Sequence, residues 1–256
     1  MNFFFGVKSS FLDSKLTIPR FQNSSLSSKN HFLFQFTIKS KRWHINQMVN
    51  IESNADFFTV AENYIDKDSF YCLATFDEAK KFTNNNGEKL IDLNSYTNTN
   101  PSYRANLQVS NLNGGFSSYQ SEYPFSMTTK NGNILSPLGT LLNKNADNNI
   151  IFFKNIYELP IKEKFLIYFI NYRSKQIIHK EEALSNSLNE IIVDRKLINP
   201  DIFMYTDKFI GVPIFCSITN NHISFEHTHP PHEYIISKNK FKIVSRLKKE
   251  FNEIIN

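Results

Sequence analysis

The chain has 256 residues, of which 41% are hydrophobic and 21% charged, as expected for a folded protein with a substantial core. No run of eighteen apolar residues occurs, and this excludes a membrane-spanning helix. Residues 1–50 contain seven Lys or Arg and one acidic residue, so they carry a net charge of +6 and the remainder carries −1. The high pI therefore describes the N-terminal fifth and does not indicate specific nucleic-acid binding.

Residues 1–30 are basic and rich in Ser and Asn, and we predict that they form a poorly ordered lead-in to a single β-rich domain over residues 31–256. The lead-in loosely resembles an organellar transit peptide, although Arg is scarce. No secretory signal is recognisable, so we expect a cytoplasmic protein. Cys72 and Cys216 lie in apolar runs and are predicted to be buried free thiols.

The first half of the chain contains scattered strand patterns. Phe32, Phe34, Phe36 and Ile38 alternate with polar or smaller residues, which places them on one face of a strand. Residues 84–100 are mostly Asn, Thr, Ser and Gly, a composition typical of a long exposed loop. Three further segments are short strand candidates: 57–60, 70–75 and 104–111.

Residues after 150 follow a more regular pattern of short apolar strands and polar turns. The chain contains 25 Phe and 11 Tyr, residues that favour strands. Strands at this spacing predict a mainly β fold, an antiparallel β-sandwich or barrel-like domain. The predicted strands are 150–156, 165–172, 176–180, 190–193, 202–205, 212–219 and 222–225.

The C-terminus carries a helical pattern. Ile243, Leu247, Phe251 and Ile254 recur at helical spacing, which predicts an α-helix packed on the sheet. A nucleic-acid recognition helix is less consistent with the pattern, because acidic residues interrupt its basic face.

Four of the seven histidines lie within eleven residues, from His222 to His232. If the strand that begins at His222 continues to His229, His227 and His229 lie on one face, because side chains alternate along a strand. His232 or Glu233 would then complete a site for Zn²⁺, Fe²⁺, Ni²⁺ or Mn²⁺. We therefore predict a divalent-metal site formed by His227, His229, His232 and Glu233.

The spacing of these residues partly matches known metal motifs. His227, His229 and Glu233 match the spacing of the first cupin motif, but Asn221 stands where that motif has glycine and no histidine follows His232. The pattern therefore assigns no family. A rigid surface turn with hydrogen-bonded imidazoles is the competing interpretation.

A Tyr- and Ser-rich segment follows Gly114-Gly115. Phe116, Tyr119 and Tyr123 are candidates for contacting a sugar or a peptide. The competing interpretation is that these rings cover one end of the sandwich.

Two functional classes follow from these patterns. The first is a metal-binding β-sandwich or barrel protein, potentially a metal-dependent enzyme acting on a small molecule or a sugar. The second is a non-catalytic module that binds a carbohydrate or a protein. The sequence decides neither the ligand nor the oligomeric state.

Overall fold

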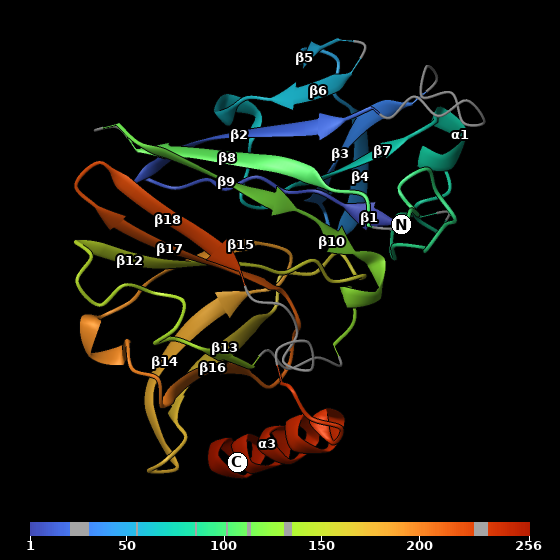
Figure 1. The fold of residues 1–256 in the computed structure, drawn as a ribbon. Coiled ribbons are helices and arrows are strands. Elements are labelled where there is room, and N and C mark those ends of the chain that lie inside the picture. Colours follow the sequence, from blue (N-terminus) through green and yellow to red (C-terminus); the bar gives the residue numbers. More distant parts are fainter. Residues whose placement is uncertain are drawn as a thin grey trace. The chain divides into compact units, whose positions relative to one another are not determined.

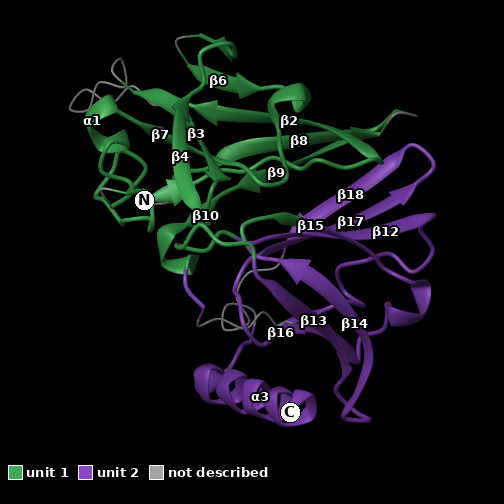
Figure 2. Ribbon diagram, turned by 180° about the vertical axis from the view of Figure 1, so that it is seen from behind, with its two compact units in different colours: residues 1–128, 156–162, 186–188 green, residues 129–155, 163–185, 189–256 purple. Residues whose placement is uncertain are grey.

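The computed structural model of the chain describes residues 1–20, 31–54, 56–84, 86–100, 102–111, 114–130, 135–227 and 235–256. The fold is mainly β, with several antiparallel sheets and a C-terminal helix, as the sequence predicts (Figure 1). Among the described strands no sheet closes into a barrel. The chain divides into two compact units, which Figure 2 shows in green and purple.

Unit 1 comprises residues 1–128, 156–162 and 186–188. Its sheets have the strand orders β1-β10, β4-β3-β7 and β5-β6-β2-β8-β9, and all the pairs with a described register are antiparallel. The strands are β1 (Asn2–Phe3), β2 (Leu12–Pro19), β3 (Phe32–Lys39), β4 (Arg42–Gln47), β5 (Glu52–Ser53), β6 (Phe57–Val60), β7 (Phe70–Ala74), β8 (Ala105–Asn111), β9 (Phe116–Ser121) and β10 (Tyr123–Pro124), with the short helix α1 (Phe76–Ala79) after β7.

The N-terminal segment is part of the core of unit 1. Phe4 exchanges two backbone hydrogen bonds with Tyr71 (2.8 and 2.7 Å), and Phe5 N donates to Ser121 Oγ at 2.9 Å. Phe3, Phe4 and Phe5 are fully buried. Because consecutive side chains point to opposite faces of an extended segment, the burial of all three shows that both faces are covered, and the sequence therefore shows no alternation. The prediction of a lead-in over residues 1–30 is therefore wrong for residues 1–20, and residues 21–30 lie outside the described ranges.

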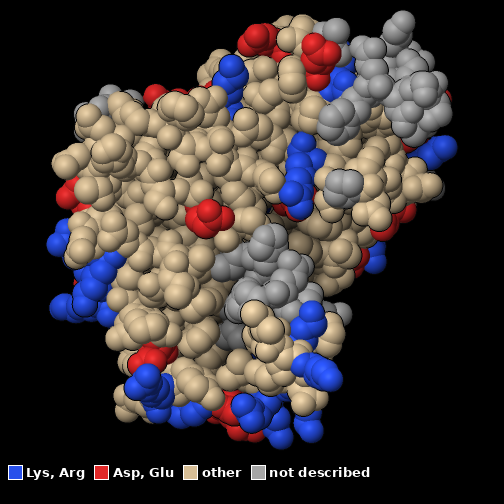
Figure 3. Space-filling view, viewed as in Figure 1, with Lys and Arg blue, Asp and Glu red and all other residues tan. Residues whose placement is uncertain are grey.

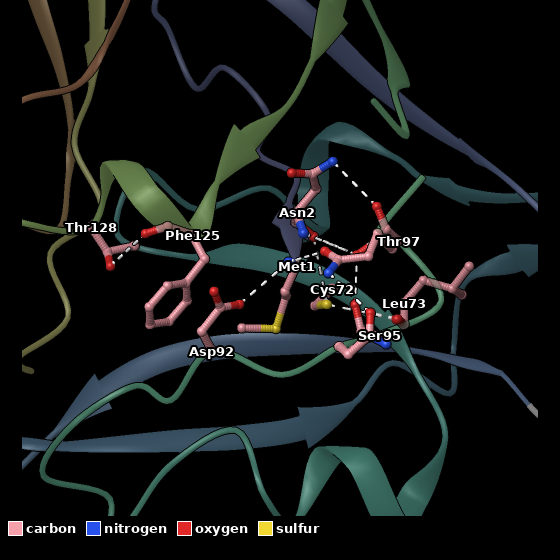
Figure 4. Close-up of polar contacts among 11 residues, drawn as sticks. Met1, Asn2, Cys72, Leu73, Asp92, Ser95, Thr97, Phe125 and Thr128 are labelled. Atoms are coloured by element: carbon pink, nitrogen blue, oxygen red, sulfur yellow. Dashed lines mark hydrogen bonds and ion pairs between the residues drawn. The ribbon is translucent and has the colours of Figure 1, made fainter. Parts of the chain in front are cut away.

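A polar network surrounds the first residues of the chain (Figure 4). The Met1 amino group lies 3.4 Å from Asp92 Oδ1, and Asn2 N donates to Thr97 Oγ1 at 2.9 Å. Thr97 is fully buried although residues 84–100 read as an exposed loop. Its hydroxyl satisfies a buried backbone group that would otherwise be unpaired, which composition alone does not reveal.

Unit 2 comprises residues 129–155, 163–185 and 189–256. It contains two four-stranded sheets, with the orders β11-β16-β13-β14 and β15-β12-β17-β18. The elements are β11 (Leu135–Pro137), β12 (Asn148–Lys154), β13 (Lys164–Asn171), β14 (Gln176–Leu184), β15 (Leu188–Ile192), β16 (Ile202–Thr206), β17 (Val212–Thr219), β18 (His222–His227) and α3 (Lys240–Ile255).

Strand β13 is buried on both faces. The Phe165 ring lies 6.0 Å from the Phe153 ring of β12, which belongs to the second sheet. Tyr168 and Ile170 face the opposite way and pack in a cluster with Phe251 of α3. This double burial explains why residues 165–170 form an uninterrupted apolar run.

Helix α3 covers one face of the β13–β16 sheet, as the helical pattern predicts. Leu247 and Ile254 pack against the cluster that contains Phe251, and Tyr205 Oη donates to Asn252 Oδ1 at 2.7 Å. Among the described helices, none combines the length and the apolar content needed to cross a bilayer. Compact units are not the same as domains, so the division into units does not test the prediction of a single domain over residues 31–256. That domain stays a prediction.

Candidate functional site

The predicted metal ligands begin at the end of β18. His227 is paired with Ile214 and Glu226 with Phe215, so their side chains leave opposite faces of the strand. The Glu226 carboxylate nevertheless reaches to 3.6 Å from His227 Nδ1. His229, His232 and Glu233 lie outside the described residues, so the predicted convergence of the imidazoles stays a prediction.

Of the other described histidines, His222 is exposed at the opposite end of β18, and the remaining three lie on other segments. His31 Nε2 is 3.9 Å from Glu78 Oε2, and His179 Nε2 on β14 is 2.6 Å from Glu181 Oε1. His44 is exposed on β4. Within the ranges that the structure describes, no three His, Cys, Asp or Glu side chains are grouped to hold a metal ion.

The Tyr-rich segment does not form a single surface. Phe116 is opposite Ser110 and Tyr119 is opposite Leu107 in the register of β8 and β9, so their side chains lie on opposite faces of the sheet. Phe116 is 70% exposed, whereas Tyr123 is fully buried.

Tyr123 has a structural role. Its hydroxyl is bonded to the carbonyl oxygens of Met127 and Ile156, each at 3.1 Å. Burial raises the pKa of the Tyr123 phenol above its ordinary value. The sequence therefore grouped a core residue with an exposed one, and a binding role for Phe116 and Tyr119 stays a prediction.

A different feature of unit 1 has the shape of a binding site. A groove of about 660 Å³ lies between the C-terminal end of β4 and the segment that follows β6. Its lining includes four amide residues together with a tyrosine, two lysines and an aspartate. The lining residues are Lys8, Gln35, Gln47, Met48, Val49, Asn50, Asn63, Tyr64, Ile65, Asp66 and Lys67, and we call this site the amide groove.

One buried hydroxyl connects the two walls of the amide groove. Tyr71 on β7 donates through its Oη to the Tyr64 carbonyl oxygen at 2.8 Å, and the Gln35 side chain hydrogen-bonds the same hydroxyl. Ser69 Oγ lies 3.4 Å from it. Tyr71 is fully buried, and this burial raises the pKa of its phenol to about 12. The buried Tyr71 hydroxyl thus helps to fix the positions of Gln35 and Tyr64 in the groove.

Charged side chains meet at one end of the groove. Lys8 Nζ lies 2.9 Å from Glu62 Oε1, and this hydrogen bond lowers the pKa of the Glu62 carboxyl. Asp13 also shares a hydrogen bond with Glu62, which raises the pKa of the Asp13 carboxyl. Lys8 is therefore held by a carboxylate while it lines the groove.

Asp66 is fixed by its own turn. Its Oδ1 accepts from the backbone N–H of Asp68 at 2.9 Å. The Asp68 carboxylate instead contacts Lys162 and accepts from Ser187 Oγ at 2.7 Å. The two carboxylates of the Asp66-Lys67-Asp68 sequence therefore serve different purposes, and Asp66 alone lines the groove.

The amide groove is not among the sites that the sequence predicts. Its polar residues come from segments far apart in the chain, and no motif spacing links them. The accumulation of amides in residues 46–50 was the available signal, but a surface hairpin has the same composition.

No protein-family model, curated protein or solved structure matches this chain.

Proposed function

We propose that the chain is a non-catalytic binding module that holds a glycan in the amide groove. The observation that carries the proposal is the convergence of Gln35, Gln47, Asn50 and Asn63 on one concave site beside Tyr64. Binding sites are typically concave, with a few polar groups that orient the ligand.

The chemistry of the groove suits hydroxyl groups. Each amide side chain offers donors and an acceptor, and a sugar hydroxyl needs both. Tyr64 is 38% exposed and presents a ring on which the apolar face of a sugar can rest. The side chains of Lys8 and Lys67 add donors at the rim. An uncharged, hydroxyl-rich ligand uses all of these groups.

Binding is favoured over hydrolysis because the groove lining has too few carboxylates for hydrolysis. Glycoside hydrolysis generally uses two carboxyl groups on either side of the scissile bond. Among the described residues that line the groove, Asp66 supplies the single carboxylate, and a backbone N–H of its own turn already occupies one of its oxygens.

The test is an array of neutral oligosaccharides followed by titration of the best binder. We expect Tyr64→Ala and Asn63→Ala each to weaken binding about tenfold, because each removes one ring contact or hydrogen-bonding group. Phe57→Ala and Gln108→Ala are matched controls, since both side chains are exposed in unit 1 outside the groove lining. Controls that lose as much affinity as the groove variants, or an array without any binder, would refute the proposal.

Divalent-metal binding is a second proposal. What supports it is that β18 is a regular strand up to His227, whose side chain is 20% exposed at the end of that strand. The proposed ligands remain His227, His229 and one of His232 and Glu233, with open positions for a substrate or water.

Elemental analysis of protein purified without a histidine tag tests the metal proposal. We expect stoichiometric metal in the parent chain, lost in His227→Ala/His229→Ala. The double variant His44→Ala/His179→Ala is the control and should keep the metal, because both of its histidines are exposed on other strands. A metal-free parent chain contradicts the proposal.

We also propose a cytoplasmic location. Cys72 and Cys216 are both free and buried, as the sequence predicted, and free thiols are compatible with a reducing compartment.

A further inference from the structure

The N-terminal end of α3 leaves large apolar side chains outside the core. Phe241 is 66% exposed and Ile236, which precedes the helix, is fully exposed. Phe251 on the same helix is fully buried. Phe241 and Val244 line a shallow hollow of about 450 Å³ together with Lys248. Exposed large apolar residues that gather in one place mark an interaction surface more often than isolated ones do.

The same end of the helix is strongly basic. Residues 235–249 contain six Lys or Arg and no acidic residue. Figure 3 shows basic side chains, with some acidic ones among them, at the bottom of the view where α3 lies. The basic residues are Lys238, Lys240, Lys242, Arg246, Lys248 and Lys249.

The cations before Arg246 have no carboxylate within ion-pair distance among the described residues. Arg246 lies 3.7 Å from Glu250 and Lys249 lies 3.9 Å from Glu253, both exposed pairs of the kind that contribute little. Lys238 and Lys242 are exposed, and the Lys240 ammonium lies 5.5 Å from the centre of the exposed Phe241 ring.

We propose that the first half of α3, with Ile236 and the exposed Phe241, binds the surface of an anionic phospholipid bilayer. A helix with exposed apolar residues flanked by lysines fits the boundary between head groups and acyl chains. Anionic lipids attract lysines near the surface by about 1 kcal/mol each. Lys248 and Lys249 line the hollow beside Phe241, where their amines can contact a head-group phosphate.

A bilayer explains both features of this surface, whereas the other anionic partners explain one. Nucleic acid uses the cations but gives no role to an apolar side chain as exposed as Ile236. An acidic peptide would have to supply a matching apolar face as well as its charge. Both are outcomes of the test.

Cosedimentation with vesicles tests the proposal. The parent chain should pellet with vesicles of phosphatidylcholine mixed with phosphatidylserine and stay in solution with phosphatidylcholine alone. The variant K238Q/K240Q/K242Q should bind on the order of 100-fold more weakly, from three lost lysines. The control K39Q/K41Q/R42Q changes the net charge equally, at the exposed β3–β4 turn, and should bind like the parent chain.

A second variant tests the apolar contribution. Phe241→Ser should weaken vesicle binding without unfolding the protein, because the ring lies mostly outside the core. The proposal is overturned if the parent chain ignores the anionic vesicles, if the control loses as much as the lysine variant, or if Phe241→Ser binds like the parent. Binding to a DNA duplex or to polyglutamate without binding to vesicles also overturns it.

Discussion

Tyr71 is a buried residue that holds two residues of an exposed site in place. Its hydroxyl bonds to the Tyr64 carbonyl oxygen and to the Gln35 side chain, and both of these residues line the amide groove. Binding sites work best when supporting groups fix the residues that touch the ligand. Tyr71 supplies such support without touching the ligand.

Alkaline pH tests the burial of Tyr71. Its pKa is raised from 10.0 to about 12, so the folded state holds the phenol proton more tightly than the unfolded chain does. The stabilisation from this group is therefore complete below pH 10 and lost as the pH rises toward 12. We expect the free energy of unfolding of the parent chain to fall across this window by up to about 3 kcal/mol more than that of Tyr71→Phe.

Urea unfolding at several pH values measures this difference. Tyr71→Phe should also be about 1 kcal/mol less stable at neutral pH, because the hydrogen bond to the Tyr64 carbonyl is lost. Burial also raises the pKa values of Cys72, Tyr123 and Cys216, but these groups are common to both proteins and cancel in the comparison. Parallel pH profiles for the two proteins would mean that Tyr71 is not the titrating group.

Single residues were harder to predict than strands, for a physical reason. Asn220 in the turn between β17 and β18 has a φ of 49°, a conformation that depends on local chemistry because Asn tolerates it. Tyr123 and Thr97 were misjudged, since their burial depends on partners far away in the chain. The same limit hid the amide groove.

At the scale of elements, α3 offers a matched pair of phenylalanines. Phe251 is fully buried, with the rings of Tyr205 and Phe203 at 5.4 and 5.9 Å. Phe251→Ala should lower the free energy of unfolding by about 3–5 kcal/mol, through lost burial and a cavity. Phe241→Ala on the same helix should change it by less than about 0.5 kcal/mol.

Chemical denaturation of the two variants measures this contrast. Equal losses would show that the helix is not docked through the face that contains Phe251. A small loss for Phe251→Ala alone would show that α3 contributes little to the core of unit 2.

The strands after residue 150 could be predicted because their apolar runs are separated by recognisable turns. Strand β2 was missed because Ser14 occupies a buried position in the middle of its alternation, where its hydroxyl bonds to the Val7 carbonyl. Strand β4 was missed because it is an edge strand with few apolar residues. An alternating pattern fails where a polar group is buried and satisfied by a distant partner.

In the whole molecule, neither compact unit is one continuous segment of the sequence. Unit 1 takes residues 156–162 and 186–188 from the second half of the chain. Asn186, with a φ of 54°, joins these segments: its side chain accepts from Tyr157 N at 2.7 Å and donates to the carbonyls of Leu159 and Ile161. Such contacts leave no periodic trace in the sequence.

The net charge of a long segment also concealed a local basic surface. The residues after 50 carry −1 in total, yet residues 235–249 carry six cations and no acid. Averaging over distant segments hid the basic surface of α3, although its charge could be counted directly from the sequence.

Glycan binding in the amide groove is tested by a nuclear magnetic resonance titration with the best oligosaccharide from the array. The side-chain amide signals of Gln35, Gln47, Asn50 and Asn63 should shift together with increasing ligand. The exposed amides of Asn106 and Gln108 on β8 should stay unchanged. Shifts confined to β8 and β9, or no shifts in the groove at saturating ligand, would contradict the account.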